Sequence, residues 1–149
     1  MTTIENKSGF QFINFLKVKE TEINQYQPVA GSFAVIQCHA MYLLCYNKWR
    51  KQWELPAGQR EEGETAKECA IRELYEETGQ ELQDLLFKGL LKVRNRRDGN
   101  IKYNPVYFSA VKELQPFAEN EEMTKIQLWD RNEYIGYIDE VDILILDFL

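Results

Sequence analysis

The sequence predicts an α/β (α+β) fold in which a mixed β-sheet lies between helices. Three observations predict it: several short segments rich in strand-forming residues, one helix with clear start and stop signals, and an apolar C-terminal segment with helical spacing. The chain has 149 residues, of which 44% are hydrophobic. It is therefore long enough to bury a core, and we expect a single domain over residues 1–149.

The first half of the chain predicts strands separated by turns. Residues 10–18 are rich in aromatic and β-branched side chains and indicate a strand. After a turn at Pro28 and Gly31, the apolar run 33–46 is long enough for a buried strand or a hairpin. The polar residues 47–52 then predict a turn, which leads into a short strand over 53–55.

The clearest element is a helix that ends at about Thr78. The sequence Thr65-Ala66-Lys67-Glu68 is a capping box, in which the Thr65 hydroxyl and the Glu68 carboxylate each satisfy a free backbone N–H. Gly79 follows at the position where a helix commonly ends in a left-handed residue. These local signals predict a helix of about three turns.

The second half predicts three more strands and a closing helix. Residues 85–93 and 103–111 indicate two strands, and Asp98-Gly99 between them predicts a tight turn. Residues 125–129 indicate another strand. The segment 139–149 carries apolar residues at helical spacing and predicts a helix over the sheet.

Composition excludes some functions. The chain has 18 basic and 24 acidic residues, a net charge of −6, which argues against a protein that binds nucleic-acid phosphates through a basic surface. Its three cysteines show no metal-type spacing and indicate a reducing, cytoplasmic location. We expect no signal peptide, no DNA-binding segment and no membrane span. The sequence leaves a homodimer possible.

Three glutamates, Glu73, Glu76 and Glu77, fall on one arc of the predicted helix, beside its apolar face. Two such charges about 5.5 Å apart repel by roughly 3 kcal/mol at an effective dielectric constant of 20. A hard divalent cation held by oxygen ligands, Mg²⁺ or Mn²⁺, would relieve this repulsion. The alternative is a solvated acidic face, which is common in glutamate-rich helices.

The helix and the loop before it together form a longer pattern that resembles the signature of the Nudix hydrolases. The matching positions are Gly58, Glu64, Arg72, Glu73, Leu74, Glu76, Glu77 and Gly79. The last position of the signature is normally aliphatic and here is Gln80. The resemblance implies an α/β/α sandwich and a metal-dependent enzyme that cleaves a diphosphate linked to another group.

The resemblance also implies roles for individual residues. Glu73, Glu76, Glu77 and the carbonyl group of Ala57 are the implied metal ligands. Arg72 is implied to orient an acid, and at i, i+4 it can reach Glu76.

Two further positions of the signature support the site by resemblance. Glu64 is implied to act behind the metal ligands through a water molecule. Gly58 allows the backbone to pass close to the ion.

The general base has two candidates by resemblance. One is Glu73 within the signature, and the other is a glutamate from a later loop. That loop offers Glu119, Glu121 and Glu122, and we favour Glu122.

The substrate is less clearly indicated. The sequence Leu55-Pro56-Ala57-Gly58 resembles the entry to the signature in hydrolases of ADP-ribose and nucleotide sugars, so we favour a small diphosphate of that type. A nucleoside triphosphate pyrophosphatase and a non-catalytic nucleotide-binding module are the alternatives.

Basic and aromatic residues supply further candidates for substrate contacts. The candidate phosphate-binding residues are Arg50, Arg94, Arg96 and Arg97. Trp49, Trp53, Tyr103 and Tyr107 are either core residues or stacking partners for a base. His39, the single histidine, is expected to be structural.

Overall fold

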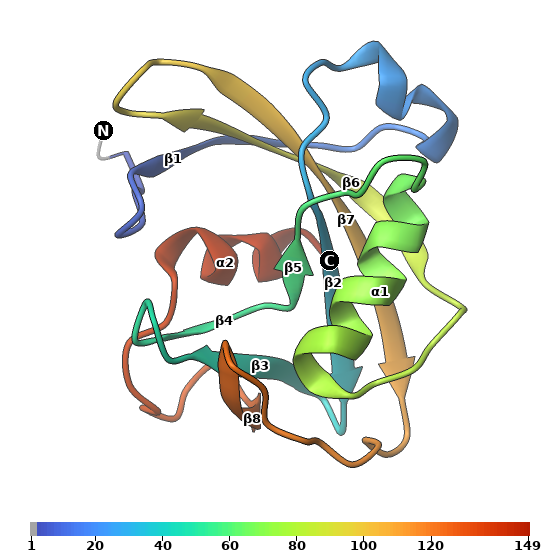
Figure 1. The fold of residues 1–149 in the computed structure, drawn as a ribbon. Helices are drawn as coiled ribbons and strands as arrows, with labels where there is room; N and C mark the ends of the chain where they lie inside the picture. Colours follow the sequence, from blue (N-terminus) through green and yellow to red (C-terminus); the bar gives the residue numbers. More distant parts are fainter. Residues whose placement is uncertain (1–2) are drawn as a thin grey trace.

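A computed structural model describes residues 3–149 of the chain (Figure 1). In this part of the chain, eight strands form one sheet. The strands are β1 (Phe10–Leu16), β2 (Ser32–Cys38), β3 (Met41–Asn47), β4 (Gln52–Glu54), β5 (Ala57–Gly58), β6 (Leu86–Asn95), β7 (Ile101–Val111) and β8 (Met123–Trp129). The helices are α1 (Ala66–Thr78) and α2 (Glu140–Ile145), with 3-10 helices η1 (Glu20–Gln25) and η2 (Leu146–Phe148).

The sheet is mixed, as predicted. Its main path runs β1-β6-β7-β2-β3-β4, while β5 pairs with β2 and β8 pairs with β3. β2 and β7 pair in parallel, and the other paired strands are antiparallel. β2 therefore lies in the middle of the sheet and brings β5, with Ala57 and Gly58, against α1, where these two residues contact Glu77 and Glu73.

The two α-helices cover opposite faces of the sheet (Figure 1). Because side chains alternate along a strand, Ala34 and Ile36 of β2 belong to the core under α1, whereas Val35 belongs to the core on the other face. Ala70 of α1 packs into the first core and Val141 of α2 into the second. The predicted helix–sheet–helix layering is thus confirmed.

Helix α1 forms where the sequence predicts it. The Thr65 hydroxyl accepts the Glu68 N–H at 3.1 Å, and a Glu68 carboxylate oxygen accepts the Thr65 N–H at 2.9 Å. Gly79 ends the helix in a left-handed conformation with φ of 77°. A Cβ atom on Gly79 would also lie 2.6 Å from the carbonyl oxygen of Pro116, so the chain passes close to this end of the helix.

The structure decides one point that the sequence left open and corrects two others. Of the two possibilities for residues 33–46, the hairpin is present, because His39 and Ala40 take positive φ values of 52° and 61° and reverse the chain. Gln52, expected in the polar turn, is 1% exposed and opens β4. His39 lies in the β2–β3 turn rather than within a strand.

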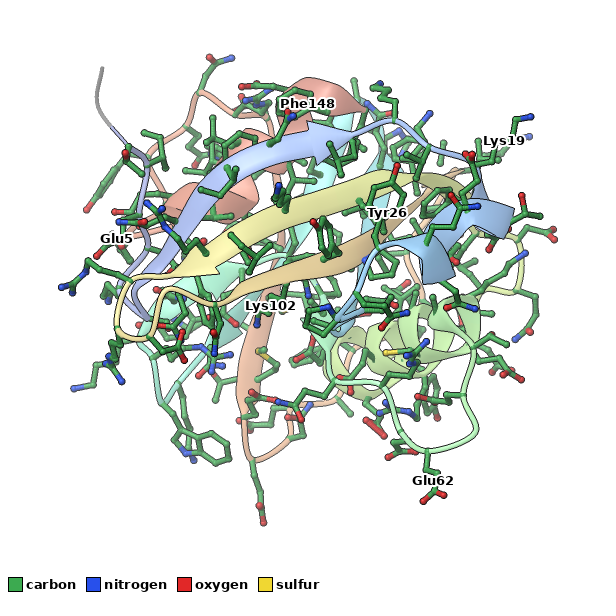
Figure 2. The ribbon with its side chains drawn as sticks, turned by 90° about the horizontal axis from the view of Figure 1, so that it is seen from above. Glu5, Lys19, Tyr26, Glu62, Lys102 and Phe148 are labelled. Atoms are coloured by element: carbon green, nitrogen blue, oxygen red, sulfur yellow. The ribbon has the colours of Figure 1, made fainter. Side chains whose placement is uncertain are left out.

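The closing helix is shorter than the predicted 139–149. It ends at Ile145 and continues as a 3-10 turn to Phe148. The Phe148 ring stacks on Phe12 and Phe15 with centroid distances of 5.8 and 5.0 Å, and Figure 2 shows it against β1. This packing draws the last residues onto β1. No helix in residues 3–149 is long and apolar enough to cross a lipid bilayer.

Candidate active site

A cavity of about 440 Å³ opens between the second half of α1, the loop before β8 and the β3–β4 turn. Its lining residues are Trp49, Glu73, Glu76, Glu77, Asn120, Glu121 and Glu122. The fold thus brings the three glutamates of α1 together with Glu122, which lies 45 or more residues further along the chain. Among the loop acids named from the sequence, Glu121 also lines the cavity and Glu119 does not.

Arg72 holds the acids in place. Its Nε donates to Glu64 at 2.6 Å, and its Nη1 donates to Glu73 at 2.7 Å and to Glu76 at 2.9 Å. Its Nη2 donates to the carbonyl oxygen of Gln59 at 2.8 Å and to Glu64 at 3.1 Å. The predicted contact between Arg72 and Glu76 is present, and Glu64 also binds Arg72 directly.

Glu77 is the most deeply buried acid of the site, with 5% of its surface exposed. Its carboxylate accepts the Ala57 N–H at 2.8 Å, which ties α1 to β5. Burial, together with the negative charges of Glu122, Glu73 and Glu54, raises the pKa of Glu77 from 4.5 to about 9. The ionised carboxylate of Glu77 is therefore unfavourable at neutral pH unless a cation binds to it.

Glu73 lies against the backbone of β5. Burial raises the pKa of its carboxyl group, and the bond from Arg72 opposes that shift. A Cβ atom built on Gly58 would overlap the Glu73 carboxyl group. Glycine at position 58 is thus required for Glu73 to reach this place, which gives a physical reason for this position of the signature.

Glu122 reaches the cavity from the loop before β8. Its Oε2 accepts the side-chain N–H of Asn47 at 3.1 Å and lies 3.7 Å from Arg50 Nη2. Arg50 makes its close contacts with Glu54, at 2.7 and 3.0 Å. Asn47, which no sequence pattern indicates, is completely buried at the end of β3 and holds this carboxylate.

The loop that carries Glu122 is tied to α1 by two amide side chains that sequence reasoning missed. Asn120 donates to the carbonyl oxygen of Glu76 at 3.0 Å and accepts the backbone N–H groups of Glu122 and Met123. Gln80, which replaces the aliphatic residue of the signature, is 2% exposed. It donates to the carbonyl oxygen of Gln115 at 2.8 Å and accepts the Gln115 N–H at 2.7 Å.

None of the four arginines proposed to bind phosphate lines this cavity, although Arg50 Nη2 lies 3.7 Å from Glu122. Arg94, Arg96 and Arg97 lie at the β6–β7 hairpin, where Arg94 donates to Gln11 and Arg96 to Glu5. None of the three lines the cavity. Their sequence cluster reflects the polar end of a hairpin.

Most of the aromatic candidates for base stacking belong to the core. Trp53 and Tyr107 are buried, and Tyr103 is half-buried against Tyr26. Trp49 differs, because it is 63% exposed and lines the cavity.

The chemistry of the donor set fits a hard divalent cation. The five glutamates that line the cavity offer only oxygen atoms as ligands, and the negative charges of Glu122 and Glu73 contribute to the raised pKa of Glu77. Across residues 3–149 no three acidic, histidine or cysteine side chains already converge at a metal-binding distance. Arg72 accounts for part of this, since it holds Glu73 and Glu76 by direct hydrogen bonds.

Comparison with known proteins identifies the family. The model of the NUDIX domain family matches residues 25–144. The chain therefore belongs to the Nudix hydrolase family, as the signature predicted.

A sequence relative gives a shorter match. The mRNA-decapping protein g5R of African swine fever virus is 38% identical over 60 residues, which are 40% of this chain and 24% of that protein. The chain thus covers about a quarter of the length of this relative.

Solved structures share the fold. The MutT NUDIX hydrolase of Burkholderia pseudomallei has a TM-score of 0.70 at 20% identity, covering 83% of this chain and 98% of that one. A mutant of the Bacillus subtilis pyrophosphohydrolase BsRppH has a TM-score of 0.72 at 18% identity, covering 98% and 92%. The NUDIX domain of Shewanella oneidensis NrtR, solved with ADP-ribose, has a TM-score of 0.68 at 13% identity, covering 87% and 95%.

Proposed function

We propose that this chain is a Mg²⁺- or Mn²⁺-dependent pyrophosphatase that hydrolyses the diphosphate linkage of a nucleoside diphosphate derivative, of the ADP-ribose or nucleotide-sugar type. The observation that carries the proposal is the cavity in which Glu73, Glu76, Glu77 and Glu122 meet. A cavity lined by so many carboxylates repels a diphosphate unless cations lie between them.

The residues that would hold the metal are Glu73, Glu76 and Glu77, with the Ala57 carbonyl group contributing as the resemblance implies. When bound, the ion would screen the charge of the diphosphate and polarise the phosphorus atom. Arg72 keeps Glu73 and Glu76 from turning away into solvent, because one guanidinium bonds both of them and Glu64.

Glu122 is the residue that we assign as general base. It would take a proton from the water molecule that attacks one phosphorus atom, while the bond from that phosphorus to the bridging oxygen breaks. Asn47 bonds only one of its two carboxylate oxygens, so the other is free to accept the proton. Glu73 is the alternative base, but its carboxylate is already bound by Arg72.

The test is a panel of diphosphates assayed with Mg²⁺, with Mn²⁺ and with excess chelator. We expect ADP-ribose to yield AMP and ribose 5-phosphate in the presence of either metal and no product in chelator. UDP-glucose, nucleoside triphosphates and capped RNA complete the panel, because the sequence relative is a decapping protein. Undiminished hydrolysis in chelator would contradict the metal requirement, and a preference for triphosphates or RNA would replace the proposed substrate.

A further inference from the structure

Trp49 is exposed to solvent, where a tryptophan side chain contributes little to the stability of the fold. Of the three tryptophans, Trp53 and Trp129 are 5% and 6% exposed, whereas Trp49 is 63% exposed. Leaving an aromatic ring of this size in water forgoes the stabilisation that its burial would give. A single exposed aromatic side chain is normal on a protein surface, so an explanation of this one must come from where it lies.

The position of Trp49 supplies that explanation. The residue lines the same cavity as Glu73, Glu76, Glu77 and Glu122. It is the one aromatic side chain among the residues that line this cavity in the described part of the chain.

The turn that carries Trp49 is fixed to the acids. The Trp49 N–H donates to Asn47 Oδ1 at 3.0 Å, and the Lys48 N–H donates to the carbonyl oxygen of Glu122 at 2.9 Å. Because Asn47 also holds the Glu122 carboxylate, the backbone at Trp49 and the general base share one anchor. The tryptophan is thus held at a set distance from the reaction site.

The residues beside Trp49 favour an anionic ligand with a planar ring. Lys48, Arg50 and Lys51 are exposed in the same turn, and Arg50 Nη2 lies 3.7 Å from the Glu122 carboxylate. A ring that stacks on Trp49 would place its attached phosphates between these cations and the glutamates.

A second cavity competes for the base but fits it less well. It lies beside β5, is lined by Phe10, Phe33 and Lys102 among others, and measures about 180 Å³. Ligand pockets usually measure about 300 Å³ or more, and the cavity at Trp49, at about 440 Å³, exceeds that value. Lys102 is also already placed over the Phe10 ring, 4.0 Å from its centroid.

We infer that Trp49 is a specificity-determining residue, whose ring stacks on the nucleobase of a substrate with its diphosphate in the adjoining acidic cavity. The inference rests on the proposed function and narrows its substrates to those that carry a base next to the diphosphate. It assigns Trp49 to substrate selection, separate from the chemical step.

Two non-hydrolysable probes test the inference by equilibrium binding in Mg²⁺. The first is α,β-methylene-ADP, and the second is methylenediphosphonate, which has the same bridged phosphorus pair without a nucleoside. We expect α,β-methylene-ADP to quench the tryptophan fluorescence and methylenediphosphonate to leave it nearly unchanged. Trp49→Ala should weaken binding of α,β-methylene-ADP by about 5- to 150-fold, the range typical of base–aromatic stacking, and leave binding of methylenediphosphonate unchanged.

Three variants make the outcome specific. Trp49→Phe should restore part of the lost affinity, because a smaller ring still stacks. Tyr134→Ala is the matched control, since Tyr134 is 88% exposed and does not line the cavity. Phe33→Ala tests the cavity beside β5.

Different failures separate the inference from the function it rests on. An equal loss of affinity for both probes in Trp49→Ala would show that Trp49 maintains the shape of the cavity rather than binding the base. This result would overturn the inference. Loss of α,β-methylene-ADP binding in Phe33→Ala but not in Trp49→Ala would place the base beside β5 and overturn it as well. If the parent protein binds neither probe in Mg²⁺, the proposed function fails, and the inference fails with it.

Discussion

Glu77 is an acidic residue whose surroundings disfavour its ionised form. It is buried almost completely, and it is one of five acids that line a single cavity. Burial and neighbouring negative charge both raise its pKa, to about 9, so without a cation the folded protein favours the neutral form. An acid kept in so unfavourable a place without a bound cation is typical of a functional site rather than of a stabilising contact.

We predict that Glu77→Gln abolishes turnover while the metal-free protein stays as stable as the parent or becomes more stable. The glutamine keeps an oxygen for the Ala57 N–H and removes the buried charge. The rise in melting temperature caused by Mg²⁺ should shrink, because an amide is a weaker ligand and less metal binds. Melting curves with and without Mg²⁺, measured beside turnover, check this.

The control for Glu77 is Glu62→Gln, an exposed glutamate that Figure 2 shows pointing away from the molecule. It should behave as the parent does. An active Glu77→Gln variant with an unchanged Mg²⁺-dependent melting shift would rule out Glu77 as a metal ligand and return the site to a solvated acidic face.

We also predict that Glu122→Gln slows turnover by about 100-fold or more, as loss of a general base commonly does. Glu119→Gln is the matched control from the same loop, because Glu119 is exposed and does not line the cavity. The kcat of both variants, measured at saturating Mg²⁺, checks the assignment. Equal rates for the two variants, or greater damage from Glu121→Gln, would show that Glu122 is not the base.

At the scale of elements, Gln80 shows how one substitution joins two segments. An aliphatic residue at this position would only pack behind α1. Gln80 instead closes a pair of hydrogen bonds with the backbone of Gln115, at the start of the segment that leads to Glu122. Asn120 makes the second connection, from that segment to the last turns of α1.

We predict that Gln80→Leu, although it restores the aliphatic residue of the signature, destabilises the protein by about 1–3 kcal/mol. Leucine leaves the Gln115 N–H and carbonyl groups without their partners. Because the freed segment carries Glu122, kcat should fall more than metal affinity does. Chemical denaturation and Mg²⁺ titration check the two effects, and a variant as stable and active as the parent would show that this connection does not position the loop.

Elements whose ends are set by neighbouring residues could be predicted from the sequence. Elements that depend on contacts between distant residues could not. Helix α1 was predicted to the residue because Thr65, Glu68 and Gly79 form its caps within the chain itself. The parallel pairing of β2 with β7 joins residues about 70 positions apart, which no local pattern records. The sequence left open whether residues 33–46 form one strand or a hairpin, because His39 and Ala40 are not residues that usually mark a turn.

The same division holds for the candidate site. The acids on α1 and Arg72 share a fixed spacing and were found, whereas Asn47 and Asn120 act through contacts made only in the folded chain. A cluster such as Arg94, Arg96 and Arg97 is typical of phosphate-binding sites, but the β6–β7 hairpin that carries these residues does not line the cavity. Short polar side chains that position a catalytic group carry no spacing signal, so sequence reasoning overlooks them.

At the scale of the whole molecule, acidic groups are buried on both faces of the sheet. Asp139 and Asp142 lie at the start of α2 and are each 6% exposed. Asp139 caps α2 by accepting the backbone N–H groups of Val141 and Asp142, and Asp142 accepts the Leu55 N–H next to β4. This pair attaches α2 to the same chain segment, β4 to β5, that supports the candidate site from the other face.

The buried pair makes the stability of the whole domain depend on pH. Burial, with the charge of Asp139 close by, raises the pKa of Asp142 well above its ordinary value of 3.8, and burial also raises the pKa of Asp139. The folded protein therefore keeps a proton on the pair at pH values where the unfolded chain has released it. Since the folded state then binds more protons, the free energy of unfolding falls as pH rises above about 3.8, up to the raised pKa of the pair.

Asp142→Asn is predicted to flatten this dependence and to leave the protein at least as stable at neutral pH. The asparagine carries no charge, its oxygen can still accept the Leu55 N–H, and its amide can donate to Asp139 as the protonated Asp142 does. Denaturation at a series of pH values in the absence of metal measures the effect, and Asp147→Asn, at a half-exposed residue paired with Arg131, is the control. If Asp142→Asn reproduced the pH dependence of the parent, the pair would carry no shared proton, and the attachment of α2 to β4 would depend on apolar packing instead.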